Sequence, residues 1–311
     1  MSDVCIVGSF MMDLIARTPR FPKPGETITG SSFTMTPGGK GFNQAIAAAR
    51  AGASVAMVGR VGDDAYGEEF RTWLEREGVD ASGVSVDDEV GTGVGLPMVD
   101  DEGQNCIVII PRSNLELHAE QVQGQAEQIR AARVVVMQLE VPEDANQAAA
   151  QIAHDAGKTV ILNPAPFREI PVEMLEHVDL LLPNESELAQ LAESIGISTQ
   201  CSIDEVAQAV HAKMNLDLIV TLGEEGALVV DDEGTQTVPS LKVKAVNTVG
   251  AGDTFTGNLA ALLAQEVPLR EAAARANVAA ACSVTRVGSA DSAPRHDELD
   301  AWVASLTADA Q

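Results

Sequence analysis

The sequence predicts a doubly wound α/β fold, in which helices flank a mostly parallel sheet and a small inserted β-sheet forms a lid. Short and nearly continuous hydrophobic runs recur along the 311 residues, which is typical of strands buried on both faces. Helix-like segments separate most of these runs, as in a parallel sheet with crossover connections. Two further stretches carry no helix signal and interrupt this alternation.

The predicted elements follow one another along the chain. The strands are the hydrophobic runs Val4–Val7, Val55–Val58, Val134–Leu139, Thr159–Leu162, Asp179–Leu182, Leu218–Leu222 and Ala227–Val230. The helices between them are Gly41–Ala51, Tyr66–Glu77, Ala119–Ala131, Glu143–Ala156, Glu185–Glu193 and Asp204–Met214. The C-terminal part is mostly helical, over Asp253–Ala264, Leu269–Val284 and Asp297–Leu306.

The two interrupting stretches predict the lid. Leu14–Met35 is rich in Pro, Gly and Thr, and Thr92–Ile110 indicates two strands around a turn. Because neither has helical periodicity, we expect a small accessory sheet inserted into the α/β core. The predicted boundaries are an α/β core of residues 1–13, 37–91 and 111–311 and a lid of residues 14–36 and 92–110.

Acidic residues dominate the charge. The chain has 46 Asp and Glu against 20 Lys and Arg, a formal net charge of −26, and only 6 of the basic residues are Lys. Nucleic acids and anionic membranes need clustered cations, so both are excluded as partners. An acidic, lysine-poor surface is typical of proteins from a saline cytoplasm, where salt screens repulsion between carboxylates. An ordinary acidic protein is the alternative.

Cysteine usage and the N-terminus favour the cytoplasm. The 4 cysteines lie far apart and form no Cys-x-x-Cys pair, so neither a disulfide framework nor a zinc site is expected. The chain begins without a basic signal region, and no run reaches the roughly 18 apolar residues of a membrane span. We therefore expect a protein of the reducing cytoplasm.

A glycine-rich segment before residue 253 follows a strand-like run and opens a helix. Small residues at Gly250, Ala251 and Gly252 let backbone N–H groups approach an anion, which the helix dipole also favours. A carboxylate at Asp253 repels phosphate, so it is best explained as a base that accepts a proton from an attacking hydroxyl. From these residues alone, a capping Asp after a glycine turn is the alternative.

A second glycine-rich segment, residues 37–44, also opens a helix. Its three glycines, among them Gly39, permit close approach of the backbone to a ligand. Lys40 and Asn43 supply hydrogen-bond donors for a hydroxylated or anionic ligand. The alternative is a loop whose glycines serve only tight packing.

These segments are part of an ordered series of motifs. The chain resembles the ribokinase group of the PfkB carbohydrate kinase family over nearly its whole length. The motifs, in that family's order, are Gly8-Ser9 with Asp13, Pro24–Thr27, Gly38–Gln44, Val61–Asp64, Thr92–Val94, Gln138–Glu140, Asn163–Pro166, Pro183–Glu187, Thr221–Gly223 and Gly250–Asp253. One such motif is weak, whereas this many in register are specific.

The resemblance implies an ATP-dependent kinase that transfers the γ-phosphoryl group to a primary hydroxyl of a small sugar. D-ribose is the favoured substrate and ribose 5-phosphate the product. Asp253 is the implied base, and the N–H groups of Gly250, Ala251 and Gly252 are the implied anion hole. The residues implied to bind the sugar are Asp13, Gly39, Lys40, Asn43, Glu140 and Asp253.

The resemblance also implies the nucleotide and metal positions. The nucleotide positions are Asn184, Thr221, Gly223, Gly226, Gly252 and Asn277. Glu187 completes an Asn-x-x-Glu motif that organises Mg²⁺ and phosphate through water. A potassium loop is implied at Asn247, Val249, Ser283, Arg286, Gly288 and Ser292, largely through backbone carbonyls. The lid is implied to exclude water on closing and to mediate a homodimer.

Three residues depart from the family pattern. Met11 stands where the ribokinase group carries Asn, and a thioether cannot replace the lost hydrogen bonds, which predicts a sugar that lacks or reorients one hydroxyl. Arg112 stands at a usual Gly, and is either a surface residue or a partner for the carboxylate of a sugar acid. Asn247 stands at a usual Asp, so it keeps an oxygen ligand but removes a charge and weakens the expectation of K⁺.

Two alternatives to a ribose kinase stay open. A related PfkB kinase would act on fructose or on a sugar acid such as keto-deoxygluconate. A non-catalytic sugar- or nucleotide-binding regulator is the more remote alternative, because fold does not fix function. Loss of the base would be its signature, and the presence of Asp253 therefore favours an enzyme.

Overall fold

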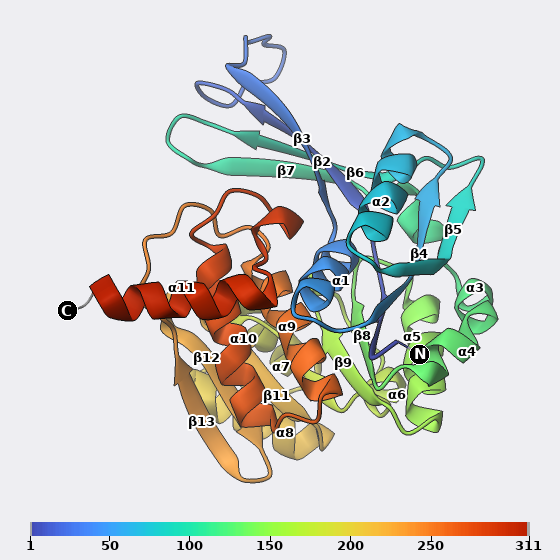
Figure 1. Cartoon of the computed structure of the whole chain (residues 1–311), viewed down its shortest axis with the longest axis vertical. Helices are drawn as coiled ribbons and strands as arrows, with labels where there is room; N and C mark the ends of the chain where they lie inside the picture. The colour runs from blue at the N-terminus through green and yellow to red at the C-terminus, as the bar shows by residue number, and fades with distance from the viewer. Residues whose placement is uncertain (1, 310–311) are drawn as a thin grey trace.

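The computed structural model describes residues 2–309 and contains two β-sheets (Figure 1). The larger sheet has nine strands in the order β13-β12-β11-β10-β9-β8-β1-β4-β5. Neighbours from β5 to β11 are parallel, and β12 and β13 are added antiparallel. Helices cover both faces, which confirms the predicted doubly wound class. Residues 1 and 310–311, at the ends of the predicted core, lie outside the described range.

Except for its two edge strands, the strands of the large sheet are buried on both faces. Their bounds are β1 (Val4–Val7), β4 (Val55–Gly62), β5 (Asp80–Asp87), β8 (Val134–Gln138), β9 (Thr159–Asn163), β10 (Leu180–Leu181), β11 (Asp217–Thr221), β12 (Gly226–Asp231) and β13 (Gly234–Pro239). Alternate residues of β1 enter opposite cores, Val4 and Ile6 on one side and Cys5 and Val7 on the other. The sequence does not predict β5 and β13, because these partly exposed edge strands have no continuous hydrophobic run.

Helices from distant parts of the chain share each face. One face is covered by α1 (Lys40–Arg50), α2 (Ala65–Arg76), α9 (Ala251–Ala264) and α10 (Leu269–Ser283). The other is covered by α3 (Ala119–Gly124), α4 (Ala126–Ala131), α5 (Glu143–Asp155), α6 (Val172–Leu175), α7 (Glu185–Ser194) and α8 (Ile203–Met214). The single helix predicted over 119–131 is two helices, because α3 ends at Gly124.

The remaining elements are short or terminal. They are the 3₁₀ turns η1 (Arg112–Glu116), η2 (Gly223–Glu225) and η3 (Ala290–Ser292), and the C-terminal helix α11 (His296–Asp309). Within residues 2–309, no helix has the length and apolar character needed to cross a bilayer.

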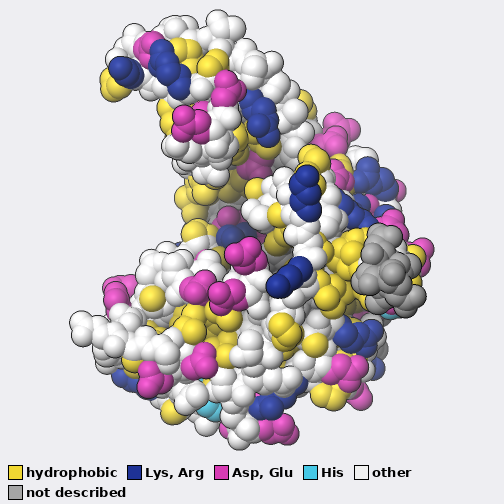
Figure 2. Space-filling view, turned by 90° about the vertical axis from the view of Figure 1, so that its left-hand side faces the viewer, with side chains coloured by type: hydrophobic (Ala, Val, Ile, Leu, Met, Phe, Trp, Pro, Cys, Tyr) yellow, Lys and Arg dark blue, Asp and Glu magenta, His cyan; other side chains and the backbone are white. Residues whose placement is uncertain are grey.

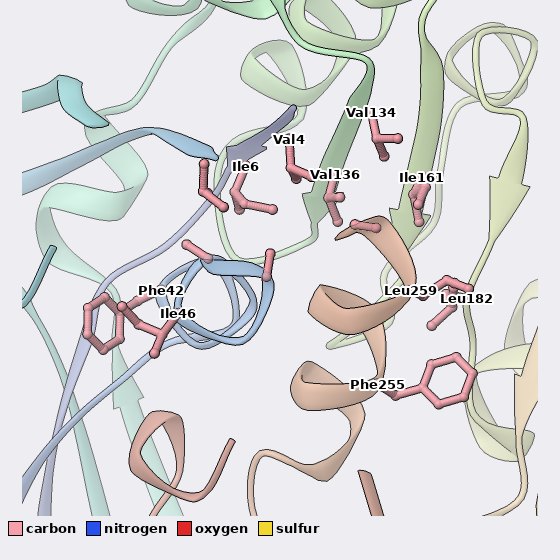
Figure 3. Close-up of a cluster of buried hydrophobic side chains, with 14 of the residues drawn as sticks. Val4, Ile6, Phe42, Ile46, Val134, Val136, Ile161, Leu182, Phe255 and Leu259 are labelled. Carbon is pink, nitrogen blue, oxygen red and sulfur yellow. The ribbon is translucent and has the colours of Figure 1, made fainter. Parts of the chain in front are cut away.

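Helices α1 and α9 pack closely against each other beneath the sheet. Figure 3 shows Phe42 of α1 and Leu259 of α9 in one buried cluster with strand residues of the large sheet. A Cβ added at Gly257 of α9 would lie 2.5 Å from the carbonyl oxygen of Gln44 and 2.6 Å from Cβ of Ala47. The glycine therefore sets the distance between the two helices, whose N-terminal ends carry both predicted glycine-rich segments.

The smaller sheet has four strands and projects from the α/β part (Figure 1). Its order is β3 (Ser32–Gly38), β2 (Met11–Arg17), β6 (Gly93–Val99) and β7 (Asn105–Ile110). The β2–β6 pair is parallel and the other two pairs are antiparallel. Figure 2 shows a hollow between this sheet and the rest of the molecule.

Candidate active site

The candidate site forms where the parallel strands end. Ser9 follows β1, Glu140 follows β8, Asn163 ends β9, Asn184 follows β10 and Thr221 ends β11. Because β1 lies between β4 and β8, the chain winds away from it in both directions. In open α/β sheets such a switch point leaves a crevice beyond the carboxyl ends of the strands, where ligands bind.

Asp253 lies in the first turn of α9 with 9% of its surface exposed. Its Oδ2 accepts a hydrogen bond from Nδ2 of Asn43 and its Oδ1 accepts one from Nε2 of Gln44, both at 2.9 Å. Gly250 opens the helix with a φ of 80°, in the left-handed region. The first N–H groups of a helix have no partner within it, although the N–H of Ala251 donates to the carbonyl of Thr248, before the helix, at 3.3 Å. Asp253, Gly250 and Gly252 all line one cavity, so the carboxylate lies beside these N–H groups.

Behind Asp253 lies a network of buried amides that the motifs did not identify as site residues. Oε1 of Gln44 accepts from Nε2 of Gln138 at 2.6 Å, and Nε2 of Gln44 also contacts Oδ1 of Asn163 at 3.1 Å. Nδ2 of Asn163 donates to the carbonyl of Leu182 at 2.7 Å. The available signal was that these amides stand in segments that are otherwise apolar, where an unpaired amide is costly.

The predicted sugar-binding carboxylates come from the two sheets. Asp13 lies on β2 of the small sheet, and Glu140 follows β8 of the large one. Oε2 of Glu140 accepts from the backbone N–H of Lys40 at 2.9 Å and from the hydroxyl of Ser9. A Cβ at Gly95 would lie 2.2 Å from Oδ1 of Asp13, so this glycine leaves room for the carboxylate. The structure thus brings Asp13, Lys40 and Glu140 to one end of the crevice.

The charges at the site shift one another's pKa values. Burial, and next the charge of Glu140, raises the pKa of Asp13 to about 6. Burial lowers the pKa of Lys40, but the carboxylates of Asp253, Glu140 and Glu187 together raise it above its usual value. Burial also raises the pKa of Glu187. Lys40 is therefore held as a cation among three carboxylates.

Asn184 and Glu187 form a reciprocal cap at the start of α7. Oδ1 of Asn184 accepts from the N–H of Glu187, and the N–H of Asn184 donates to Oε2 of Glu187, both at 2.9 Å. Across residues 2–309, no three His, Cys, Asp or Glu side chains lie together as a metal site. Oxygen donors of this kind suit Mg²⁺, which keeps several waters and takes substrate phosphates as ligands. The donor set therefore fits a magnesium ion that arrives with a nucleotide.

A cavity of about 130 Å³ joins these groups, and its walls include Lys40, Glu187 and Asp253. A larger cavity, of about 460 Å³, lies among α6, α7 and α8 and is lined by none of the predicted site residues. The candidate site is therefore placed at the smaller cavity, because the predicted site residues line that cavity and not the larger one.

The predicted nucleotide positions extend beyond that cavity. Thr221 lines it and forms a parallel bridge with the segment after β10. Gly223 and Gly226, with φ values of 58° and 111°, form the turn between β11 and β12. Asn277 on α10 is buried, and its Nδ2 donates to the carbonyl of Pro239 at 3.0 Å. Gly223, Gly226 and Asn277 do not line this cavity, and their contacts with a nucleotide stay a prediction.

The predicted potassium positions lie on two loops that meet. Asn247 and Val249 precede α9, and the other positions, Ser283, Arg286, Gly288 and Ser292, lie at the end of α10 or after it. Nδ2 of Asn247 donates to the carbonyl of Gly288 at 3.0 Å. The loops are thus joined directly by two of the predicted residues.

The structure shows the surroundings of two residues that depart from the family pattern, Met11 and Arg112. Met11 is 5% exposed, and its Cγ lies 3.7 Å from the position that a Cβ of Gly95 would take, beside Asp13. Arg112 has a φ of 49°, which explains why Gly suits this position, and its Nη1 donates to the carbonyl of Thr92 at 3.1 Å. Met11 therefore borders the predicted sugar site, and Arg112 ties η1 to the start of β6.

Comparison with known proteins matches residues 1–296 to the pfkB family of carbohydrate kinases. The chain is 36% identical to a ribokinase of Lactococcus lactis over 308 residues, covering 98% of each chain. It is 34% identical to a deoxyribokinase of Salmonella typhi, covering 97% of this chain and 98% of the relative. Its structure resembles that of an Arabidopsis thaliana ribokinase solved with ribose and ATP, with a TM-score of 0.90, 30% identity, and coverage of 96% and 98%. The chain belongs to the pfkB family of carbohydrate kinases.

Proposed function

We propose that this chain is an ATP-dependent sugar kinase that converts D-ribose to ribose 5-phosphate. The observation that carries the proposal is Asp253, a buried carboxylate held by two amides beside the N–H groups of a glycine turn. Membership of the pfkB family supports the kinase chemistry, and relatives named ribokinase over almost the full length support ribose.

The geometry supports in-line phosphoryl transfer from ATP. Asp253 accepts the proton of the primary hydroxyl as its oxygen bonds to the γ-phosphorus and the bond from that phosphorus to the departing ADP breaks. The N–H groups of Gly250, Ala251 and Gly252 stabilise the negative charge on the transferred group. Asn184 and Glu187 would hold, through water, a Mg²⁺ ion bound with the nucleotide, which would neutralise phosphate charge.

The sugar end supplies acceptors for several hydroxyls. Asp13 and Glu140 each accept two hydrogen bonds when ionised. Oδ1 of Asn43 is buried and has no hydrogen-bond partner within residues 2–309. A buried acceptor without a partner is costly, and a sugar hydroxyl would satisfy it. The backbone at Gly39, with a φ of 92°, completes the turn that brings α1 to the sugar.

We assign the lid function to residues 14–36 and 92–110, with the rest of the chain as the core. The hollow beneath the small sheet supports this division, because closing it would exclude water from ATP (Figure 2).

All six residues of β7 are exposed although most are apolar, which favours a homodimer through the lid. Val108→Glu should reduce the mass measured by light scattering from dimer to monomer, and an unchanged mass would remove the lid from the interface.

The proposal includes a cytoplasmic setting and adaptation to salt. The net charge of −26 and the scarcity of Lys support a saline cytoplasm. For potassium the sequence left two alternatives, a bound ion or a loop without one, and the contacts of Asn247 favour the loop without an ion.

A sugar panel tests the proposed reaction. Purified protein with Mg-ATP should form ADP fastest with ribose, compared with fructose, ribitol and keto-deoxygluconate. Asp253→Asn should lower kcat by at least about 10²-fold while ATP still binds, because the positioned base is lost. If none of the sugars raises ADP formation above background, the proposed kinase activity is rejected. If only a sugar other than ribose is phosphorylated, ribose is rejected as the substrate.

Deoxyribose is a second candidate substrate, supported by one observation. Met11 is buried beside Asp13, where an apolar side chain offers no partner to a hydroxyl. A relative named deoxyribokinase is also 34% identical over almost the whole chain. The ratio of kcat/KM for deoxyribose and ribose decides between them, and Met11→Asn should shift this ratio toward ribose. A ratio that the variant leaves unchanged would place Met11 outside the sugar contacts.

A further inference from the structure

The side chain of Asn247 connects the two loops on which the potassium positions were predicted. Its Nδ2 donates to the carbonyl oxygen of Gly288 at 3.0 Å, across 41 residues of sequence. Its Oδ1 accepts from the N–H of Val249 at 3.0 Å. The amide nitrogen therefore has an acceptor and the amide oxygen has a donor.

The orientation of this amide follows from its partners. A reversed amide would place Oδ1 against the Gly288 carbonyl and Nδ2 against the Val249 N–H, two contacts between like groups. Only the orientation with nitrogen toward Gly288 satisfies both. A cation bound to the Gly288 carbonyl would have to lie against the positively polarised hydrogens of Asn247.

Other oxygens of the predicted potassium set are also engaged. The carbonyl of Ser283 accepts from the N–H of Arg286 at 3.0 Å. The hydroxyl of Ser292 donates to the carbonyl of Ser289 at 2.7 Å. The carbonyls of Gly288 and Ser283 and Oδ1 of Asn247 thus each accept a hydrogen bond from the protein itself, so these oxygens do not form the open donor set that a monovalent cation needs.

The joined loops support the anion hole. Val246 and Asn247 both donate their N–H groups to the carbonyl of Val284, at 2.7 and 3.1 Å. A Cβ at Gly250 would lie 3.1 Å from the carbonyl oxygen of Ser289, so the turn that opens α9 rests on the second loop. Fixing one loop against the other consequently fixes the N–H groups that face the phosphate.

We propose that the amide of Asn247 takes the place of a monovalent cation, so that this kinase holds its anion hole closed without potassium. A carboxylate at this position would place a negative oxygen against the Gly288 carbonyl and would need a cation between them. The neutral amide supplies a hydrogen there instead. The inference rests on the proposed kinase function for its activity measurements, but not for its stability measurement.

The test compares KCl with tetramethylammonium chloride at equal ionic strength. The wild-type kcat/KM for ATP should differ by less than about twofold between the two salts, because no ion is required. Asn247→Asp should lose about tenfold in the organic salt and regain it in KCl, since the carboxylate needs a counter-ion. Asn247→Ala is the matched control: it removes the amide without adding a charge, and potassium should not restore its activity.

Thermal unfolding gives a second measurement that needs no turnover. The melting temperature of the wild type should be the same in both salts, whereas that of Asn247→Asp should rise in KCl. Activation of the wild type by potassium of more than about twofold, or a higher wild-type melting temperature in KCl, would overturn the inference. Equal activity of Asn247→Asp in both salts would overturn it as well. Absence of phosphorylation in every salt rejects the proposed function and leaves the melting comparison to decide.

Discussion

Gln44 donates its side-chain amide to Oδ1 of Asp253 at 2.9 Å, while its own Oε1 accepts from Gln138 at 2.6 Å. Asn43 donates to the other oxygen of the carboxylate. The carboxylate is therefore fixed by two consecutive residues of α1, which hydrogen-bond to α9 across 210 and 209 positions of sequence. Gln44 acts through Asp253 and is a positioning residue.

Replacing Gln44 tests this positioning. Gln44→Leu should lower kcat by about 10–100-fold while changing KM for the sugar little, because a base displaced by a fraction of an ångström reacts poorly but binds hydroxyls almost as before. Gln208→Leu is the control, since Gln208 bonds to Thr235 on an exposed surface. A parallel loss of kcat and affinity, or no loss, would contradict a positioning role.

The carboxyl of Asp13 should make stability depend on pH. Its pKa is raised from 3.8 to about 6 by burial and by Glu140, so the folded state holds the proton more tightly than the unfolded state. This contribution stabilises the fold below about pH 4 and is lost as the pH rises through 6. At pH 7.5, urea unfolding should therefore give Asp13→Asn an unfolding free energy about 1–3 kcal/mol higher than that of the wild type.

Two comparisons make that result specific to Asp13. The stability difference between Asp13→Asn and the wild type should shrink toward zero when urea unfolding is repeated near pH 4. The variant should also bind the sugar less tightly, since an amide accepts fewer hydroxyl hydrogen bonds than a carboxylate. A difference that does not vary with pH would show that Asp13 is not the titrating group.

The close contact at Gly257 should limit substitution there. Gly257→Ala adds a Cβ 2.5 Å from the Gln44 carbonyl, which should cost about 1–3 kcal/mol of unfolding free energy and separate α1 from α9. Gly124→Ala in α3 is the matched control, because its Cβ would meet nothing within 4 Å. That control should be neutral or stabilising. Equal behaviour of the two variants in urea unfolding would show that the helices can move apart freely.

Salt should stabilise the protein. With a net charge of −26, repulsion among surface carboxylates is strongest at low ionic strength and is screened as salt is added. We expect activity to persist in molar KCl or NaCl and the unfolding free energy to rise by on the order of 1 kcal/mol or more from low salt. A stability that does not change with salt would make the acidic composition incidental.

The pattern of apolar residues along the sequence predicts most of the strands and helices. Continuous apolar runs identified β1 and β8, because strands buried on both faces need such residues. The same criterion missed β5, an edge strand with Asp and Ser on its exposed side. The break at Gly124 was missed because helical periodicity continues across it.

For the site, motif and periodicity predict which residue types stand at the strand ends and helix starts, because both are properties of neighbouring residues. The contact of Gln44 with Asp253 across 209 positions, the interaction of Asp13 with Glu140 and the hydrogen bond from Asn247 to Gly288 become visible only in the folded chain. These contacts depend on how α1, α9 and the two sheets pack, and packing is set by the whole chain at once.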